Sequence, residues 1–357
     1  MPKKFSGKAL LNPNIKILVQ GKALSPELEA DFVSAKVSED IDAPSMFDLK
    51  FVTWDIEKQQ FTWIDKEVFE VGDTIEIQIG YDNNLLTVII GEITGLEPEF
   101  SQDSTPMLVV RGHDFGHRLL RGRQTRSFKD MKDSDIVSIV AKGKGLTSNV
   151  DDTKTKLEYV LQHNQTDWEF LQERAARLGY EVAIENKELF FRTPEISEKQ
   201  LFTITFGDDL QDFYPRLSTM NLVSQVQVQG WIPKDKKAVV MKTGAGKEGN
   251  LMAGQTSGAK EVQRAFGNSS DQIVNQSVSS KAEAEQISVG LFQFGLLNYI
   301  TGEGTCIGYP NLRAGKVIEI AGVGKKFGGL YYLLTVEHSY SATDGYQTAF
   351  TVRRNAT

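Results

Sequence analysis

One β-rich pattern occurs twice in the 357-residue sequence, and it limits the possible folds more than any other feature. Residues 71–80, VGDTIEIQIG, are answered by residues 314–322, AGKVIEIAG. Two further segments of the first copy recur in the same order in the second: 94–101 as 335–341, and 107–112 as 349–354. Each copy reads as a strand, a loop and a hairpin, so the sequence predicts two copies of one antiparallel β-barrel.

The strands of the first copy are short and closely spaced. Ile75, Ile77 and Ile79 alternate with polar residues, which is the period-2 pattern of a half-buried strand. Similar patterns predict strands at 14–19, 30–37, 46–52, 85–91, 92–100 and 107–112, and later at 201–206 and 223–230. We therefore expect a first tube barrel at 1–112 and a second built from 201–232 and 293–357.

The segment between the barrels changes character. Thr166 is a good N-cap for a helix with one apolar face, Gly179 ends that helix, and residues 180–192 alternate as a hairpin. We expect an α/β domain at 113–200. Residues 233–279 lack periodicity and form either a mobile insertion or a small subdomain ordered by a partner.

A helix capped by Ser280 and running from Lys281 to about Tyr299 completes an insertion at 233–292. We interpret its apolar part, 287–299, as barrel packing in preference to membrane insertion. The predicted fold class is α+β, mainly β: two similar antiparallel β-barrel domains, an α/β domain and an insertion subdomain.

Composition excludes several function classes. The net charge of −7 disfavours a general nucleic-acid surface, and the single cysteine, Cys306, fits a reducing compartment. Residues 1–8 lack the apolar core of a signal peptide, and no apolar run reaches the roughly 18 residues that span a bilayer. We expect neither secretory export nor membrane insertion.

Candidate chemical groups are few, and each has a structural explanation. We expect no catalytic, cofactor-binding or metal-binding residues. The groups considered are His113, Asp114 and His117 as metal ligands, Cys306 with His338 as nucleophile and base, the phosphate-loop-like segment 244–249, and the carboxylates Asp167 and Glu169.

One basic cluster remains, formed by Arg118, Arg121, Arg123 and Arg126. It has no interleaved aromatic residues, so we favour ion pairs with an acidic neighbouring subunit over nucleic-acid binding. Arg353 and Arg354 close the second copy of the repeat and join the predicted subunit-interface set.

The segment TDWEFLQERAARLGYEV, at 166–182, resembles the middle domain of the phage tail baseplate hub family, which includes late-control gene D proteins and the N-terminal hub part of VgrG proteins. Further blocks that resemble this family lie at 206–231, 302–340 and 350–356. VgrG proteins continue into an OB-fold and a spike, whereas this sequence ends at Thr357. Either the spike is a separate chain or the sequence is truncated.

The resemblance implies a structural protein rather than an enzyme. A homotrimer with two barrels per protomer would present six similar units to a six-fold tail tube and three to a trimeric spike, and would start tube assembly. The implied partners are the tail tube ring, the spike and baseplate wedge proteins, with nucleic acid or cargo passing only through the channel. The implied location is the bacterial cytoplasm, then a virion or injection-system baseplate. The alternatives are a tail-associated cell-wall hydrolase and an effector-carrier module.

Overall fold

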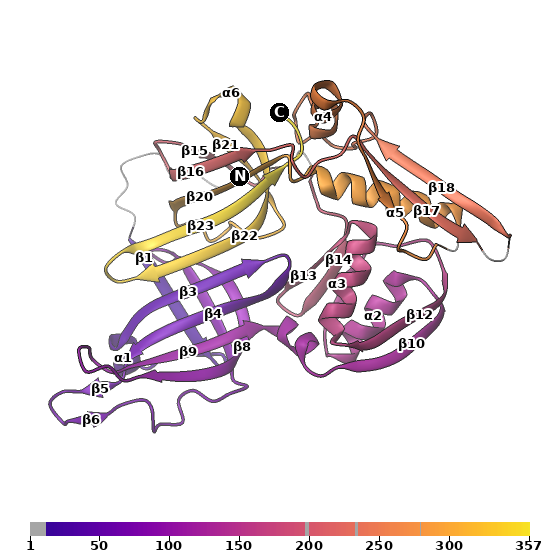
Figure 1. Ribbon diagram of the computed structural model, residues 1–357. Helices are drawn as coiled ribbons and strands as arrows, with labels where there is room; N and C mark the ends of the chain where they lie inside the picture. The colour runs from indigo at the N-terminus through magenta and orange to yellow at the C-terminus, as the bar shows by residue number, and fades with distance from the viewer. Residues whose placement is uncertain (1–11, 197–199, 233–234, 279) are drawn as a thin grey trace.

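The computed structural model describes residues 12–196, 200–232, 235–278 and 280–357 (Figure 1). Most of its regular structure is β-strand, which confirms the predicted α+β, mainly β class. The N-terminal segment assessed for a signal peptide, residues 1–8, lies outside the described residues. Within the described part of the chain, no helix is both long and apolar enough to cross a bilayer.

The largest sheet contains thirteen strands drawn from both halves of the chain. They are β1 (Pro13–Val19), β2 (Lys22–Ala23), β3 (Phe32–Asp40), β4 (Ala43–Val52), β7 (Thr74–Tyr81), β8 (Asn84–Glu99), β9 (Met107–Asp114), β15 (Thr203–Thr205), β16 (Leu210–Leu217), β20 (Ile300–Ile307), β21 (Val317–Ala321), β22 (Gly329–Ser341) and β23 (Gly345–Arg354). Their order is β16-β20-β23-β22-β3-β4-β9-β8-β7-β1-β2, with β21 on β22 and β15 on β21. The two strands expected at 85–91 and 92–100 are one continuous strand, β8.

The two halves of this sheet repeat one topology. In the first half the antiparallel order is β3-β4-β9-β8-β7, and in the second it is β16-β20-β23-β22-β21. Each strand also takes the same place in chain order within its half. The repeat read from the sequence is therefore a repeat of structure.

Two β-bulges recur at equivalent places and fix the alignment of the halves. Val33 is the extra residue of β3 against β4, and Gln211 is the extra residue of β16 against β20. Thr94 is the extra residue of β8 against β9, and Leu334 is the extra residue of β22 against β23. Bulges are specific features of a strand pair, so their coincidence supports a common origin of the two units.

This alignment corrects part of the repeat that was read from the sequence. Residues 75–77 match 318–320 as expected, both reading Ile-Glu-Ile. In β8 and β9 the equivalent residues differ from those expected. When the bulges are aligned, Thr94 is equivalent to Leu334 rather than to residue 335, and Met107 is equivalent to Gln347 rather than to residue 349. The shift of two residues in β9 preserves the period-2 pattern, whereas the shift of one residue in β8 falls at the bulge, where the alternation is interrupted.

The two repeated units have separate hydrophobic cores. The first core includes Phe47, Leu49 and Ile77, and the second includes Tyr331 and Phe350. Within the described residues no strand pairing joins β1 or β2 back to β3. Closure of the units into barrels therefore stays a prediction, as do the domain boundaries.

The expected α/β segment lies beside this sheet. It contains the 3₁₀-helix η1 (Phe115–Leu120), the helices α2 (Asp133–Gly143) and α3 (Asp167–Leu178), the pair β10 (Gln124–Met131) and β12 (Leu157–Gln165), and a sheet of β11 (Thr147–Val150), β14 (Glu188–Arg192) and β13 (Glu181–Glu185). The Thr166 hydroxyl accepts from Glu169 N at 3.1 Å, and Gly179 ends α3 at φ 67°. The predicted strand, capped helix and hairpin are confirmed.

A third sheet carries a correction. β17 (Gln225–Ile232) pairs with β18 (Lys237–Gly244) and β19 (Ser270–Ile273), although its sequence was assigned to the second barrel. Val228 and Val239 of this sheet share a core with α3 and with α5 (Lys281–Leu296). Alternation shows that such a strand has a buried face, but it does not show which core buries it. The helix predicted from Lys281 to Tyr299 ends at Leu296, and its Ser280 cap accepts from Glu283 N at 3.1 Å.

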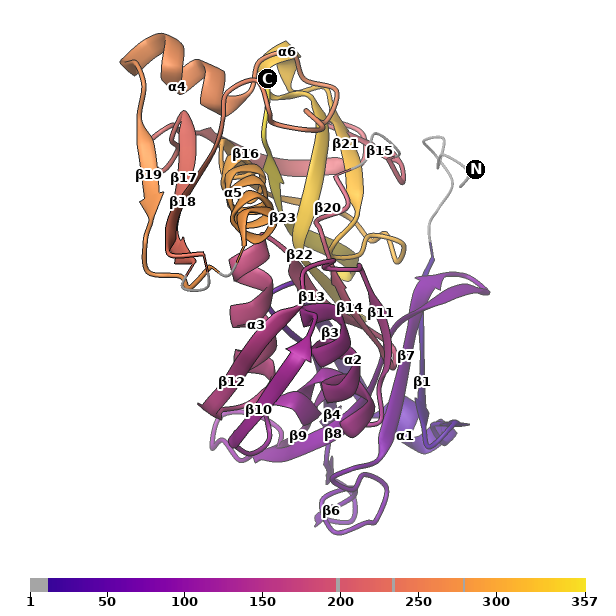
Figure 2. The same ribbon diagram turned by 90° about the vertical axis from the view of Figure 1, so that its right-hand side faces the viewer.

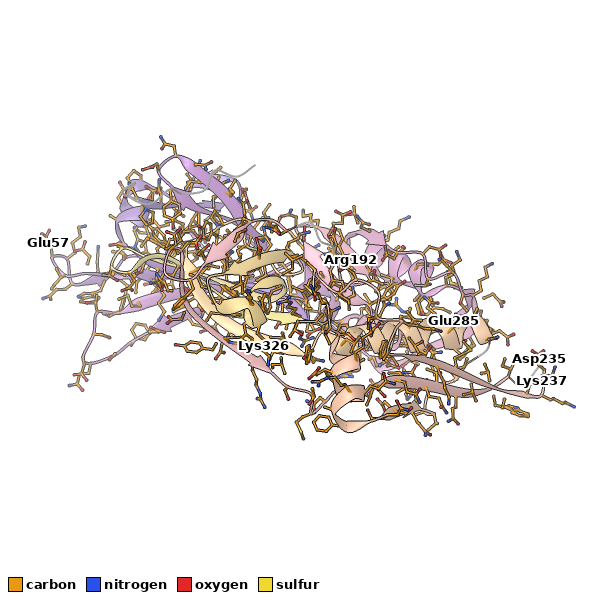
Figure 3. All side chains as sticks on the ribbon, turned by 90° about the horizontal axis from the view of Figure 1, so that it is seen from above. Glu57, Arg192, Asp235, Lys237, Glu285 and Lys326 are labelled. Atoms are coloured by element: carbon orange, nitrogen blue, oxygen red, sulfur yellow. The ribbon has the colours of Figure 1, made fainter. Side chains whose placement is uncertain are left out.

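The remaining short elements lie mainly at the periphery. They are α1 (Pro26–Ala30), β5 (Trp54–Asp55), β6 (Gln60–Phe61), α4 (Gly258–Phe266) and α6 (Gly324–Phe327). Viewed from above, Glu57 of the β5–β6 turn lies at one end of the molecule, and Asp235 of the β17–β18 turn and Lys237 of β18 lie at the other (Figure 3).

Two glycines let α3 and α5 meet closely, one helix above the other (Figure 2). A Cβ on Gly290 would come within 1.8 Å of the Leu178 carbonyl oxygen, and a Cβ on Gly179 would come within 2.3 Å of the Gly290 carbonyl oxygen. Both obstacles are backbone atoms, which cannot rotate away. This contact holds the third sheet against the α/β segment.

We predict that Gly290→Ala lowers the free energy of unfolding by about 2 kcal/mol or more, because the two helices must separate. Gly295→Ala is the matched control: it lies in the same helix, has nothing within 4 Å of its Cβ, and gains up to about 1 kcal/mol in helix propensity. Urea unfolding of both variants checks this. Equal stability of the two variants would contradict a close helix contact.

Candidate functional site: the junction between the two halves

The two repeated units are joined by one run of antiparallel pairing. Thr335–Ser341 of β22 pairs with Ser34–Asp40 of β3 without a register shift. In Figure 1 the indigo β3 therefore lies beside the yellow β22, although the two strands come from opposite ends of the sequence. The junction makes one sheet out of two units.

One face of the sheet at this junction is polar. Lys36 Nζ lies 2.8 Å from Glu337 Oε2, and the Ser38 hydroxyl donates to the same oxygen at 3.2 Å. On the first unit this face continues with Arg111, which donates to Asp48 at 2.6 Å and to Glu97 at 3.0 Å. These side chains are partly exposed and carry both signs of charge, so the face suits contact with water better than contact with an apolar partner.

The opposite face of the junction buries a charged pair. Glu39 of β3 is 6% exposed, forms an ion pair with Arg313, and accepts from Ala314 N at 3.1 Å. Burial raises the pKa of Glu39 to about 7, against the opposing effect of Arg313. The sequence analysis missed this residue. A signal was present in the sequence: Glu39 follows Ala35 and Val37 at the inward positions of a period-2 strand, where a carboxylate is unusual.

A buried polar cluster lies next to the pair. Tyr346 OH lies 2.8 Å from His338 Nδ1, and His338 Nε2 lies 3.1 Å from the Leu312 carbonyl oxygen, to which it must donate. In a neutral imidazole with its proton on Nε2, Nδ1 accepts from the Tyr346 hydroxyl. Burial lowers the pKa of His338 to about 3, and this ring therefore contributes rigidity rather than proton transfer.

A groove of about 810 Å³ lies between β1 and β3 of the first unit. Residues of β1, α1 and β3 line it, together with Tyr340 of β22. Lys16 and Glu29 are its only charged lining residues among those described. The groove therefore marks the gap between β1 and β3 rather than a set of convergent catalytic groups.

The predicted arginine cluster is engaged within the protomer. Arg118 donates to Glu92, Arg123 lies 2.8 Å from Glu169, and Arg126 lies 2.5 Å from the buried carboxylate of Asp167. Arg121 donates to His117 Nδ1 at 3.2 Å. Glu169 also completes the capping box of α3, so these arginines tie β9–β10 to the start of that helix. Their role at a subunit interface stays a prediction.

The two terminal arginines differ from each other. Arg354 is 4% exposed, lies over the Tyr331 ring, and donates to the Gly328 carbonyl oxygen at 2.8 Å. Arg353 is half-buried and lies 6.0 Å from the Phe294 ring. The structure thus places Arg354 inside the protomer, where it has little surface to offer a second subunit.

The candidate metal ligands are occupied by protein partners. His113 contacts Thr94 at 2.9 Å, His117 contacts Glu92 at 2.8 Å, and Asp114 accepts from Gly116 N at 2.7 Å. Burial raises the pKa of Asp114 to about 6, which weakens it further as a ligand. Within the described ranges no three His, Cys, Asp or Glu side chains gather as a metal site.

The other candidate groups are also structural. Cys306 is buried in β20, its Sγ lies 3.4 Å from the Thr348 carbonyl oxygen, and burial raises the pKa of the thiol. In the segment 244–249, the Glu248 carboxylate accepts from Gly246 N and from the Ser257 hydroxyl, where a phosphate loop would offer free donors.

The chain is similar to one protein family and to several solved structures of tail proteins. Over residues 11–342 the chain matches the family described as the Alg8 N-terminal domain. It is similar in structure to the 43 kDa tail protein of prophage MuSo2 from Shewanella oneidensis, with 15% identity and a TM-score of 0.70 over 96% of this chain and 98% of that one. The tail protein of Neisseria meningitidis MC58 gives 15% identity and a TM-score of 0.68, with 96% of each chain covered.

A third similar structure comes from a secretion system. An Escherichia coli component of the type VI secretion system, described as similar to the T4 bacteriophage tail proteins gp27 and gp5, gives 15% identity and a TM-score of 0.60 over 96% of this chain and 77% of that one. No curated protein is significantly similar to the chain in sequence. At these identities the likeness shows the fold, and at that level the resemblance to phage tail hub proteins is confirmed.

We predict that Glu39 makes folding less favourable as pH rises. Its pKa is about 7 in the folded chain and near 4.5 when unfolded, so the stability it allows at pH 4.5 is lost as pH rises through 7. Between about pH 4 and about pH 8, the free energy of unfolding of Glu39→Gln should rise relative to that of the natural chain by on the order of 3 kcal/mol. Urea unfolding across this range measures the difference. The contribution of His338 to the pH dependence is the same in both proteins and therefore cancels. Parallel curves would contradict the raised pKa.

Proposed function

This chain belongs to the family described as the Alg8 N-terminal domain, and from its tail-protein fold and its duplicated sheet we propose that it is the structural baseplate hub of a contractile tail or phage-like injection system. In this role it acts as a homotrimer that adapts a six-fold tail tube to a three-fold central spike. It also starts assembly of the tube.

The observation that carries the proposal is the repeated five-strand unit within one continuous sheet. A subunit with two equivalent units offers similar contacts twice per protomer. Three protomers then present about six similar sites to a tube ring and three to the spike. A chain with one such unit would need six copies to meet the same tube.

The polar face of the sheet supports an axial channel. Lys36, Glu337, Arg111 and Glu97 cover it with partly exposed charges of both signs. Such a wall stays hydrated and does not hold a polyanion strongly, which suits the passage of nucleic acid or protein cargo. We propose that this face lines the channel and that the tail tube ring, the trimeric spike and wedge proteins surround the trimer. The assembly would form in the bacterial cytoplasm and become part of a virion or injection-system baseplate.

The hydrolase alternative has little support. It needs convergent acid and base groups or a metal set, and the groups considered for these roles among the described residues are bonded to their own protein neighbours. The effector-carrier alternative would rest on the β17–β18–β19 sheet, where nothing identifies a cargo. The hub remains the function that the geometry supports best.

We predict that the chain forms a complex of three copies when mixed with its tube protein and its spike protein. Mass measurement in solution and averaged particle images check the copy number and the ring. A tube protein from an unrelated tail serves as the control. A monomer that neither partner changes would contradict the proposed hub.

A further inference from the structure

An arginine on the polar face of the first unit has no counterpart in the second unit. The bulge alignment of β9 with β23 makes Thr351 the equivalent of Arg111. The strand registers agree, because Arg111 lies directly opposite Asp48 of β4 and Thr351 lies directly opposite Glu303 of β20. The two units therefore differ by a charged side chain at one matched position.

In the first unit this arginine binds two carboxylates, one from the strand on each side of it. Arg111 Nε donates to Asp48 Oδ1 of β4 at 2.6 Å, and Nη1 donates to Glu97 Oε1 of β8 at 3.0 Å. The planar guanidinium can reach both because its donors point in fixed, separate directions. Charge-assisted hydrogen bonds of this kind are stronger than those between neutral groups.

The second unit keeps both carboxylates. Glu303 takes the place of Asp48 in the strand registers. Glu337 takes the place of Glu97, because each lies opposite the residue two positions before the arginine or its replacement. Thr351 has neither the length nor the charge to bind them. The two acidic groups of the first-unit arrangement are thus present without their arginine.

These two carboxylates can accept from further donors. Glu303 is exposed and forms no ion pair with any residue that the structure describes. Glu337 lies 2.8 Å from Lys36 Nζ and accepts from the Ser38 hydroxyl at 3.2 Å. Both contacts are to Glu337 Oε2, so Oε1 can accept from another group.

A hollow of about 310 Å³ opens beside both carboxylates. Its lining includes Tyr214, Glu303, Thr335, Glu337 and Thr351. Thr335 and Thr351 have short side chains, and their hydroxyls lie 2.8 Å apart. In the first unit the long side chain of Arg111 extends from the equivalent position to reach its two partners. The second unit therefore has room for a guanidinium that comes from another chain.

An aromatic ring borders this hollow where the first unit has a lysine. Tyr214 of β16 lies directly opposite Glu303, just as Lys36 lies directly opposite Asp48. The Tyr214 ring is 65% exposed. The face of an aromatic ring attracts a guanidinium that stacks on it. A ring at this position therefore adds to the attraction of the carboxylates for an arginine.

The loss of positive charge extends over this part of the polar face. Lys36, Lys50 and Arg111 of the first unit are replaced by Tyr214, Thr305 and Thr351 of the second. The carboxylates of Glu303 and Glu337 remain. A face that keeps these acidic groups and loses its basic ones attracts a positively charged ligand.

We propose that this hollow of the second unit binds the guanidinium of an arginine side chain from a partner protein, which takes the place that Arg111 has in the first unit. The guanidinium donates to Glu303 on one side and to Glu337 on the other, and it stacks on Tyr214. Binding of the arginine does not depend on the trimer. The location of the partner segment within the axial channel rests on the proposed function.

A peptide titration tests the site on the natural chain. The probe is acetyl-Gly-Arg-Gly-amide, and the readout is the methyl NMR signals of Thr335 and Thr351, which line the hollow. Both signals should shift and saturate as one site. Peptides with lysine or with uncharged citrulline in place of arginine should bind at least about tenfold more weakly, because only the guanidinium combines the charge with the planar fork.

Variants of the hollow separate this site from a general acidic surface. Thr351→Arg supplies the guanidinium from within the chain and should abolish peptide binding, whereas Thr351→Val, which keeps the shape of the side chain, should retain it. Glu303→Gln should weaken binding at least about tenfold. The matched control is Glu99→Gln, which removes a carboxylate of the same face that lies outside the hollow and contacts Lys50. It should leave the affinity unchanged.

Three results would overturn the proposed site: no saturable shift, equal binding of the arginine and lysine peptides, or equal losses in Glu303→Gln and Glu99→Gln. These measurements use the protomer, whereas the copy number with tube and spike proteins is measured separately. Failure of the peptide to bind thus leaves the hub intact. Failure of the trimer to form leaves the arginine site intact and removes only its placement in a channel.

Discussion

The backbone pairing of β22 with β3 is the interaction on which the rest of the structure depends. It joins two units that have separate hydrophobic cores and makes their sheets continuous. The duplication therefore places one strand of each unit side by side, and their backbone groups pair with one another across the junction.

The placement of charge follows from this arrangement. Arg118 binds Glu92 of the first unit, whereas Arg123 and Arg126 bind carboxylates at the start of α3. Glu39 and Arg313 lie buried behind the junction, and burial there makes the carboxylate hold its proton near neutral pH. The partly exposed pairs lie instead on the polar face of the sheet, where Lys36 meets Glu337. Buried charge thus stiffens the protomer, while exposed charge remains available for solvent and neighbours.

Much of the local structure could be read from the sequence. The Thr166 cap, the stop at Gly179 and the alternation of Ile75, Ile77 and Ile79 predicted the elements in which these residues lie, because each signal depends on neighbours a few residues away. The assignment of β17 was wrong because alternation reveals a buried face without naming the core that buries it. Glu39 was missed because its partner, Arg313, is distant in sequence.

The sequence by itself determined the class of the fold, the capped helix and the existence of a β-rich repeat, since periodicity, capping and turn residues are local properties of the chain. Only the tertiary structure decided the alignment of the two copies, the pairing of β22 with β3, and the core that buries β17. The physical reason is that strand pairing is made by backbone groups common to all residues. Bulges, prolines and buried neighbours then select one partner among many, and they act only once distant segments are in contact.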